Sequence, residues 1–198
     1  MKKPVKKTEY PFFELRRQAF HICLGLAIIL LSKYQILSAR GLFIILIVGI
    51  LLSMVSSRYK LPGIKWFLKN FERRDIPYPG QGAIYFVLGS FAVLGLFPQN
   101  IAYAAIMILA LGDSLATIAG KYFGKHKMGD KTVEGTIVGV IAGFIGAVFF
   151  VSASAAFLGS FVAMLAEALE IRLFGKVIND NILVPIVSAF IMYGVSLL

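Results

Sequence analysis

Seven apolar runs, each near the length of a membrane-spanning helix, divide this 198-residue chain. A span needs about 20 predominantly apolar residues, because the hydrocarbon core of a bilayer is about 30 Å thick. Backbone groups in lipid must be satisfied within the segment, and no run shows the alternation of a membrane barrel. The sequence therefore predicts an all-α polytopic membrane protein of about seven helices. The runs cover residues 18–37, 41–56, 80–97, 101–120, 135–152, 155–171 and 182–198.

The composition agrees with this class. Hydrophobic residues make up 59 % of the chain and charged residues 15 %, whereas a soluble domain has about 45–50 % and about 25 %. This balance excludes a soluble globular domain, and the high apolar content excludes intrinsic disorder. The length predicts one catalytic domain over residues 1–198.

The basic residues are segregated. The segments 1–17, 57–79, 121–134 and 172–176 hold 18 of the 20 lysines and arginines. Since these segments are alternate connections, the positive-inside rule predicts a cytosolic N-terminus and an external C-terminus. This pattern favours membrane orientation over nucleic-acid binding. All ten acidic residues fall on or near the same side, so we expect the active site to face the cytosol.

The connection 57–79 contains a basic amphipathic helix. Ile64, Phe67, Leu68 and Phe71 follow the i, i+3, i+4, i+7 spacing of one helical face. Such a helix suits the lipid headgroup layer. Two interpretations stay open at this point: a passive anchor, or a gate for a lipid substrate.

Asp113 lies within an apolar run. A carboxylate at the centre of a spanning helix costs roughly 2.5–3.5 kcal/mol on insertion scales. It is tolerated only with a partner, a cation or a wet cavity. Either a lysine of a neighbouring helix pairs with it, or it serves as a metal ligand or proton acceptor.

The connection 121–134 combines glycines with four lysines and leads into a helix at Thr132. A helix N-terminus with basic residues beside it binds phosphate readily. The stretch fails as a Walker A motif, because Asp130 separates the glycine from Lys131. Glu134 stands where a phosphate-bound Mg²⁺ would need a carboxylate. The alternative is a flexible basic loop that sets topology.

Three further positions carry polar groups near the predicted cytosolic ends. Glu167 faces inward from an apolar stretch, whereas Asp180 or Asn179 could simply cap the last helix. His21 is either a structural hydrogen-bond partner or a contact to phosphate or substrate. A stripe of small residues at 135, 139, 143 and 146 predicts close helix packing, which we expect to bring Asp113 near Glu134.

These motifs resemble the signature of the CTP-dependent lipid kinases, which include dolichol kinase, phytol kinase and a CTP-dependent diacylglycerol kinase. The central block reads GDSLA at 112–116, GKYFG at 120–124 and KTVEGT at 131–136. The resemblance spans roughly residues 14–190. It implies CTP as phosphate donor and a membrane alcohol as acceptor.

Phosphatidate cytidylyltransferases share the central pattern but carry a further C-terminal signature with a histidine and a glycine pair. Here residues 175–181 read GKVINDN, with neither. This departure favours the kinases, whose first helix resembles the Arg16–His21 segment. Their C-terminal block resembles Glu167 and the segment 180–185.

The hypothesis is therefore a kinase that transfers the γ-phosphate of CTP to a lipid alcohol at the cytosolic face, with Mg²⁺ as cofactor and oligomeric state left open. The acceptor is left open among polyprenol, dolichol, phytol, geranylgeraniol and diacylglycerol. The alternatives are a CDP-lipid synthase and a small ion-coupled transporter. The predicted catalytic residues are Asp113, Lys131, Glu134 and Glu167; the metal ligands Asp113, Glu134 and Asp180; the nucleotide-binding residues Gly112, Lys121, Gly124, Lys125, Lys131, Thr132 and Gly135; and the substrate or phosphate contacts Arg17, His21 and Asn181.

Overall fold

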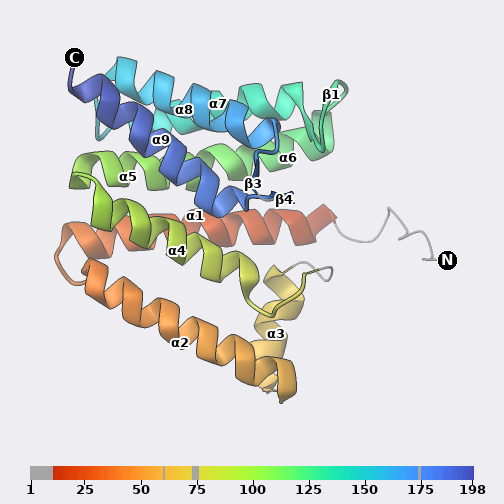
Figure 1. Ribbon diagram of the computed structural model, residues 1–198. Helices are drawn as coiled ribbons and strands as arrows, with labels where there is room; N and C mark the ends of the chain where they lie inside the picture. Colours follow the sequence, from red (N-terminus) through yellow and green to blue (C-terminus); the bar gives the residue numbers. More distant parts are fainter. Residues whose placement is uncertain (1–10, 60, 73–75, 174) are drawn as a thin grey trace.

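The computed structural model describes residues 11–59, 61–72, 76–173 and 175–198. Its framework is a bundle of helices that run side by side (Figure 1). The helices are α1 (Pro11–Lys33), α2 (Ala39–Arg58), α3 (Pro62–Phe71), α4 (Gln81–Leu96), α5 (Gln99–Met107), the π-helix η1 (Ile108–Asp113), α6 (Ser114–Phe123), α7 (Val133–Ala147), α8 (Ala153–Ala168) and α9 (Asp180–Ser196).

Three helical segments are long and apolar enough to cross a membrane: Phe12–Lys33, Ala39–Arg58 and Gln99–Phe123. Four shorter apolar helices, α4, α7, α8 and α9, accompany them. Each of these segments coincides with one predicted apolar run, so the helical class is confirmed. The crossing of the membrane by all seven stays a prediction.

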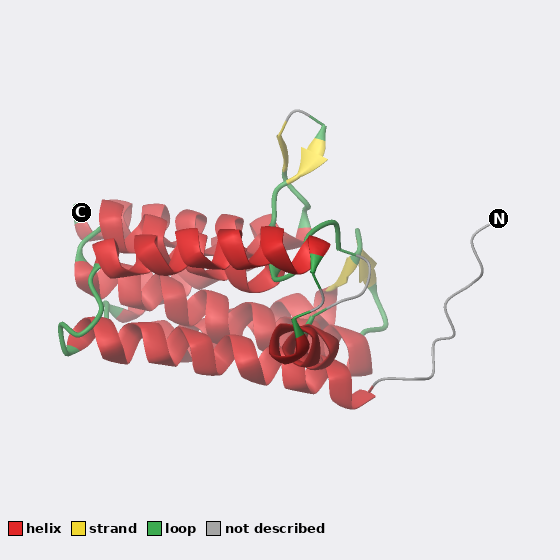
Figure 2. Ribbon diagram, turned by 90° about the horizontal axis from the view of Figure 1, so that it is seen from below, coloured by secondary structure: helices red, strands yellow, loops and turns green. Residues whose placement is uncertain are grey.

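Two small hairpins were not predicted. β1 (Lys127–Met128) pairs antiparallel with β2 (Lys131–Thr132), and β3 (Arg172–Leu173) pairs with β4 (Lys176–Val177). Both lie at one end of the bundle (Figure 2). Strands of two residues show no alternation that a sequence pattern could reveal. The left-handed backbone of Gly129 (φ 60°) permits the tight turn between β1 and β2.

The segment α5–η1 forms the centre of the molecule. Its residues from Ile101 to Ala110 are all buried, and small alanines let neighbouring helices approach. α2 is the opposite case, because only Leu42 and Leu46 of this long apolar helix are buried. Its exposed leucines and isoleucines suit contact with lipid.

The small-residue stripe of α7 packs as predicted. A Cβ atom added at Gly139 would lie 2.8 Å from the Cβ of Ala116 in α6. One added at Gly143 would lie 3.3 Å from Cγ2 of Ile108 in η1. A larger residue at either position would push α7 away from the helix that carries Asp113.

Helix α3 lies against the first helix. The ring of Phe20 in α1 is 5.0 Å from that of Phe67 and 5.6 Å from that of Phe71. Pro62 begins α3, since proline fits the first helical position. The predicted amphipathic helix is therefore present but occupies only part of 57–79, of which residues 60 and 73–75 lie outside the described part. Its place in the headgroup layer stays a prediction.

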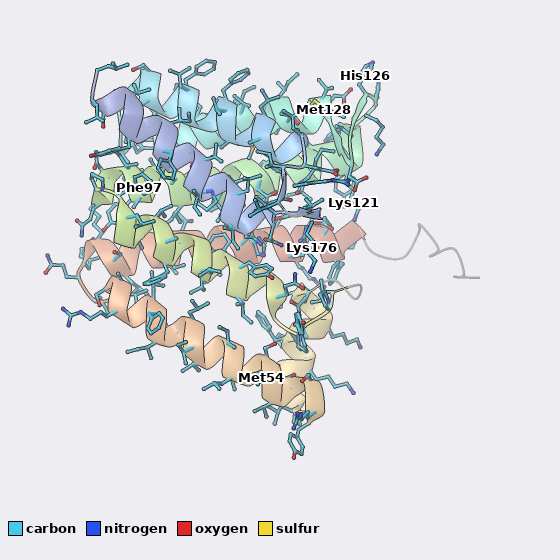
Figure 3. The ribbon with its side chains drawn as sticks, in the orientation of Figure 1. Met54, Phe97, Lys121, His126, Met128 and Lys176 are labelled. Atoms are coloured by element: carbon cyan, nitrogen blue, oxygen red, sulfur yellow. The ribbon has the colours of Figure 1, made fainter. Side chains whose placement is uncertain are left out.

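The alternate connections gather at one end. The start of α1, helix α3 and both hairpins lie at that end, and the C-terminus lies at the other (Figure 1). Lys121, His126 and Met128 mark the first end, and Phe97 marks the second (Figure 3). Residues 1–10, which hold most of the predicted basic N-terminal segment, lie outside the described part.

Candidate active site

A cavity of about 660 Å³ opens at the hairpin end of the bundle. Helices α1, α6, α7, α8 and α9 and the β1–β2 hairpin contribute to its wall. Its charged and polar lining consists of Glu14, Arg17, His21, Asp113, Thr117, Lys121, Lys127, Asp130, Lys131, Thr132, Thr136, Glu167, Glu170, Asn179, Asp180 and Asn181.

Three carboxylates from different parts of the chain meet in this cavity. Asp113 ends η1, Glu167 lies near the end of α8, and Asp180 begins α9. Each offers one oxygen, and these oxygens lie within 4.8 Å of one another. Asp113 and Glu167 are 7 % and 3 % exposed. Like charges held this close and this deep require a counter-charge.

Lys131 supplies one counter-charge. Its Nζ donates to Oδ2 of Asp180 at 2.9 Å and also to Glu167. Burial lowers the pKa of Lys131, but the carboxylates of Asp113, Glu167 and Asp180 outweigh that effect and raise it above its ordinary value. Lys131 therefore stays protonated. Three carboxylates face this one ammonium, so the cluster retains an excess of negative charge.

The donor set fits a hard divalent cation, since Mg²⁺ takes oxygen ligands and few carboxylates. The predicted ligand Glu134 lies elsewhere. Its carboxylate accepts hydrogen bonds from the backbone N–H groups of Lys125 (3.1 Å) and His126 (3.2 Å). The structure therefore brings Asp113 and Asp180 of the predicted metal set together with Glu167, whereas Glu134 is not part of this group. The physical reason is helical geometry: Gly135 and Gly139 turn toward α6, and Glu134 lies on another side of α7.

Four of the predicted nucleotide contacts lie at the cavity. Lys121, Lys131, Thr132 and Gly135 line the cavity. Thr132 caps α7, and its Oγ1 accepts from the backbone N–H of Gly135 at 3.2 Å. Arg17 and Lys127 add further positive charge.

Three other predicted nucleotide contacts lie outside the cavity lining. Gly112 packs against α7, where an added Cβ would lie 3.2 Å from the carbonyl oxygen of Gly139. Gly124 packs against the side chain of Thr132. Lys125 contributes its backbone N–H to Glu134. These three residues therefore shape the fold around the cavity.

The predicted contacts Arg17, His21 and Asn181 all line the cavity. Asn179 caps α9 by accepting from the backbone N–H of Asn181 at 3.1 Å, as one of the two predicted caps. Because Asn179 has this role, the side chain of Asp180 is available to the carboxylate cluster.

Glu14 was missed by the sequence analysis. It is buried, pairs with Arg17, accepts from Nε2 of Gln18 at 3.0 Å and lies 3.7 Å from Nζ of Lys121. On α1, a polar stripe with i, i+3, i+4, i+7 spacing is formed by Glu14, Arg17, Gln18 and His21. That spacing within an otherwise apolar helix was the available signal.

Known proteins with similar sequences fall into two groups. The Uncharacterized protein MJ1137 of Methanocaldococcus jannaschii is 32 % identical over 190 residues, which cover 90 % of this chain and 92 % of the relative. The CTP-dependent diacylglycerol kinase 1 of Schizosaccharomyces pombe is 25 % identical over 133 residues, and the phytol kinase of Synechocystis is 32 % identical over 126 residues.

The two kinase matches are partial. They cover 57 % and 59 % of this chain, and the chain spans 59 % and 52 % of the two kinases. No family model and no solved structure matches the chain. The match to the Methanocaldococcus protein extends over nine tenths of both chains, and this chain belongs to the same family as Uncharacterized protein MJ1137.

Proposed function

We propose that this protein is a membrane-bound lipid kinase that transfers the γ-phosphate of CTP to the hydroxyl of a lipid alcohol. The observation that carries the proposal is the convergence of Asp113, Glu167 and Asp180 on a cavity that Lys131 also lines. The partial similarity to a CTP-dependent diacylglycerol kinase and a phytol kinase supports the same reaction class.

The charge of the cavity supports a cation-dependent reaction. Six carboxylates and four lysine or arginine side chains line it. A triphosphate is itself strongly anionic, so it would be repelled without additional positive charge. Asp113 and Asp180 would hold Mg²⁺. When bound, the ion would neutralise charge on the phosphate oxygens.

The protein's own groups would align the reactants. Lys121, Arg17 and the start of α7 would hold the triphosphate, and Lys131 would exchange its carboxylate partners for phosphate oxygens. This exchange leaves Glu167 to accept the proton of the alcohol. The alcohol oxygen forms a bond to the γ-phosphorus while the bond to the bridging oxygen breaks, and CDP leaves.

The proposal includes an orientation of the chain in the membrane. All seven apolar segments would cross the bilayer, and the hairpin end would face the cytosol. The concentration of lysines and arginines in alternate connections of the sequence supports this placement. The alcohol would then reach the cavity from the inner leaflet, beside α3.

The test is phosphate transfer by the purified protein in lipid nanodiscs, with γ-labelled CTP or ATP and a panel of lipid alcohols. We expect Mg²⁺-dependent labelling of a lipid and release of CDP. Lys131→Ala should abolish transfer. Lys176→Ala, an exposed lysine of the neighbouring hairpin, is the matched control.

Two outcomes would overturn the proposal. Release of pyrophosphate with formation of a CDP-lipid would indicate the cytidylyltransferase reaction. Ion flux in vesicles without nucleotide, together with no labelled lipid, would indicate a transporter.

A further inference from the structure

A further cavity, of about 590 Å³, lies between the end of α2 and helix α3. Helix α3 runs across the direction of the other helices at the hairpin end of the bundle (Figure 1). We call this space the α2–α3 cavity. Among the described residues, it shares no lining residue with the cavity of the carboxylate cluster. Its lining is half polar and consists of Ser56, Ser57, Lys65, Lys69 and Glu72 together with Leu61, Leu68, Ile76, Pro77 and Pro79.

The polar side of the α2–α3 cavity offers hydrogen-bond donors to an anion. Lys65 and Lys69 are exposed, stand one helical turn apart, and form no ion pair within the part of the chain that the structure describes. Ser56 is half-buried, and its hydroxyl has no hydrogen-bond partner among the described residues. Two ammonium groups and one hydroxyl form a donor set that suits a phosphate group.

The carboxylate in this lining is engaged with the backbone. Glu72 accepts hydrogen bonds from the N–H groups of Gly80 at 2.6 Å and Gly82 at 3.4 Å. The charge of the cavity therefore favours a ligand with a net negative charge. A zwitterionic headgroup would bring its own ammonium group close to Lys65 and Lys69, where like charges repel. The headgroup of phosphatidylglycerol, an acidic phospholipid, carries no cationic group.

Three exposed aromatic residues surround the α2–α3 cavity. Tyr59 follows α2, Trp66 lies on α3 and Tyr78 lies in the loop after α3. They are 67 %, 63 % and 64 % exposed. Tyrosine and tryptophan are enriched where hydrocarbon meets the headgroup layer, because their rings are apolar and their tips are polar. These residues support a position of the cavity at the depth of the phospholipid phosphates.

An apolar stripe on α2 leads away from the cavity. Leu52, Val48 and Ile45 precede Ser56 by four, eight and eleven positions, so they share one helical face with it. All three are nearly half exposed. At 1.5 Å per residue the stripe extends about 16 Å from Ser56, which matches half of a hydrocarbon core about 30 Å thick. An acyl chain that begins at the cavity can therefore lie along α2 through one leaflet.

We infer that the α2–α3 cavity binds the headgroup of an acidic phospholipid of the surrounding bilayer. Lys65 and Lys69 contact its phosphate, the Ser56 hydroxyl donates to a phosphate oxygen, and an acyl chain follows the apolar stripe of α2. This lipid is bound without being phosphorylated, so the site is independent of the proposed reaction.

The test uses the only tryptophan in the sequence as its reporter. Trp66 neighbours Lys65 on α3, so a lipid bound in the cavity lies close to it. The full chain in phosphatidylcholine vesicles receives phosphatidylglycerol or phosphatidylcholine with a quenching spin label near the headgroup end of an acyl chain. We expect half-maximal quenching at a mole fraction of phosphatidylglycerol about tenfold lower than that of phosphatidylcholine, since each lysine near the surface favours an acidic lipid. Equal mole fractions would overturn the inference.

A pair of double variants separates a site from a basic surface. Lys65→Ala/Lys69→Ala should abolish the preference for phosphatidylglycerol. Arg172→Ala/Lys176→Ala removes the same charge from the β3–β4 hairpin at the same end of the bundle and should retain it. All four side chains are exposed, so melting temperatures should stay near wild type. Equal losses in the two variants would indicate general attraction to a negative membrane and would overturn the inference.

Ser56→Leu tests the cavity with both lysines kept. It removes the hydroxyl and places a larger apolar side chain between α2 and α3. We expect the preference to fall at least about threefold, as for the loss of a hydrogen bond to a charged group. Val55→Leu adds bulk at the adjacent position, which does not line the cavity, and should change nothing. A wild-type preference in Ser56→Leu would overturn the inference.

Free phosphate is the alternative source of the same chemistry. Inorganic phosphate added in excess should reduce quenching by labelled phosphatidylglycerol no more than chloride does at equal ionic strength, because both salts screen the lysines alike. Specific displacement by phosphate would assign the cavity to a soluble anion and would overturn the lipid assignment.

Discussion

Six carboxylates in the described part of the chain form two groups that differ in what surrounds them. Glu72, Glu134 and Glu170 accept hydrogen bonds from backbone N–H groups, at 2.6 Å from Gly80, 3.1 Å from Lys125 and 2.8 Å from Asp130. Each bond fixes a loop or a hairpin. These carboxylates therefore stabilise the conformation of the backbone.

The second group consists of Asp113, Glu167 and Asp180, which face one another and one ammonium group. Mutual repulsion makes this arrangement unfavourable unless a counter-charge or a proton offsets it. A sequence shows an acid in both cases. Only the neighbours in space distinguish an acid that organises the backbone from one that faces other acids, as the proposed cation site requires.

Among the carboxylate variants, the largest expected effect comes from Asp113→Asn, which removes a charge from the second group at nearly constant shape. We expect kcat to fall by about 10³-fold, in the range of losses for a removed catalytic electrostatic contact. Phosphate transfer in nanodiscs measures the effect, and thermal unfolding in detergent checks the fold. Transfer within tenfold of wild type would exclude Asp113 from the site.

Lys131→Met tests the counter-charge. It leaves Glu167 buried without its ammonium partner, which should cost about 3–5 kcal/mol in the free energy of unfolding and also abolish transfer. The double variant Lys131→Met/Glu167→Gln should recover most of the stability and none of the activity. A single variant as stable as the wild type would contradict the pairing.

The pH dependence of stability tests the role of Glu72, a carboxylate of the first group. Burial raises the pKa of Glu72 above its ordinary value, and hydrogen bonds from the N–H groups of Gly80 and Gly82 offset this only partly. The folded protein therefore binds this proton more tightly than the unfolded chain. Acidification from pH 7 toward 4.5 should stabilise the wild type relative to Glu72→Gln.

The measurement is the difference between the melting temperatures of the two proteins at several pH values. The wild type should gain on the variant as the pH falls, and the gain should be complete below the unfolded-state pKa. A difference that does not change with pH would show that burial does not affect this carboxyl.

Glu134→Gln should have the smallest effect. Glutamine keeps an acceptor oxygen for the N–H groups of Lys125 and His126, so transfer and melting temperature should stay near wild type. Glu167→Gln is the matched change in the second group and should reduce kcat by at least about 10²-fold. Comparable losses in both variants would remove the distinction between the groups.

The helices were predictable because hydrophobicity over a bilayer-length run is a signal carried by many residues. The hairpins were not, since each strand has two residues. The π-helix was not, because a local change of helical repeat leaves the apolar character of residues 108–113 unchanged.

The site was predictable where a single charged residue stands within an apolar stretch of the sequence. Asp113 and Glu167 are acids in apolar runs, and the structure brings both to one cavity. Glu134 was selected as a ligand because it stands where a Mg²⁺ bound to phosphate would need a carboxylate. Its true partners depend on how α7 is turned, and the meeting of Glu167 with Lys131 depends on the packing of α8. Neither can be read from local spacing.

The π-helix between α5 and α6 has a consequence for how this site could be gained or lost. A π turn holds one more residue than an α turn, and such bulges are frequent at functional sites. If residues 108–113 were wound as a regular α-helix with no residue removed, all of α6 would be rotated by about 100°. Thr117 and Lys121 would then leave the cavity although neither had been mutated. The wide turn therefore determines which face of α6 lines the cavity, although Asp113 is the one residue of 108–113 that itself lines it.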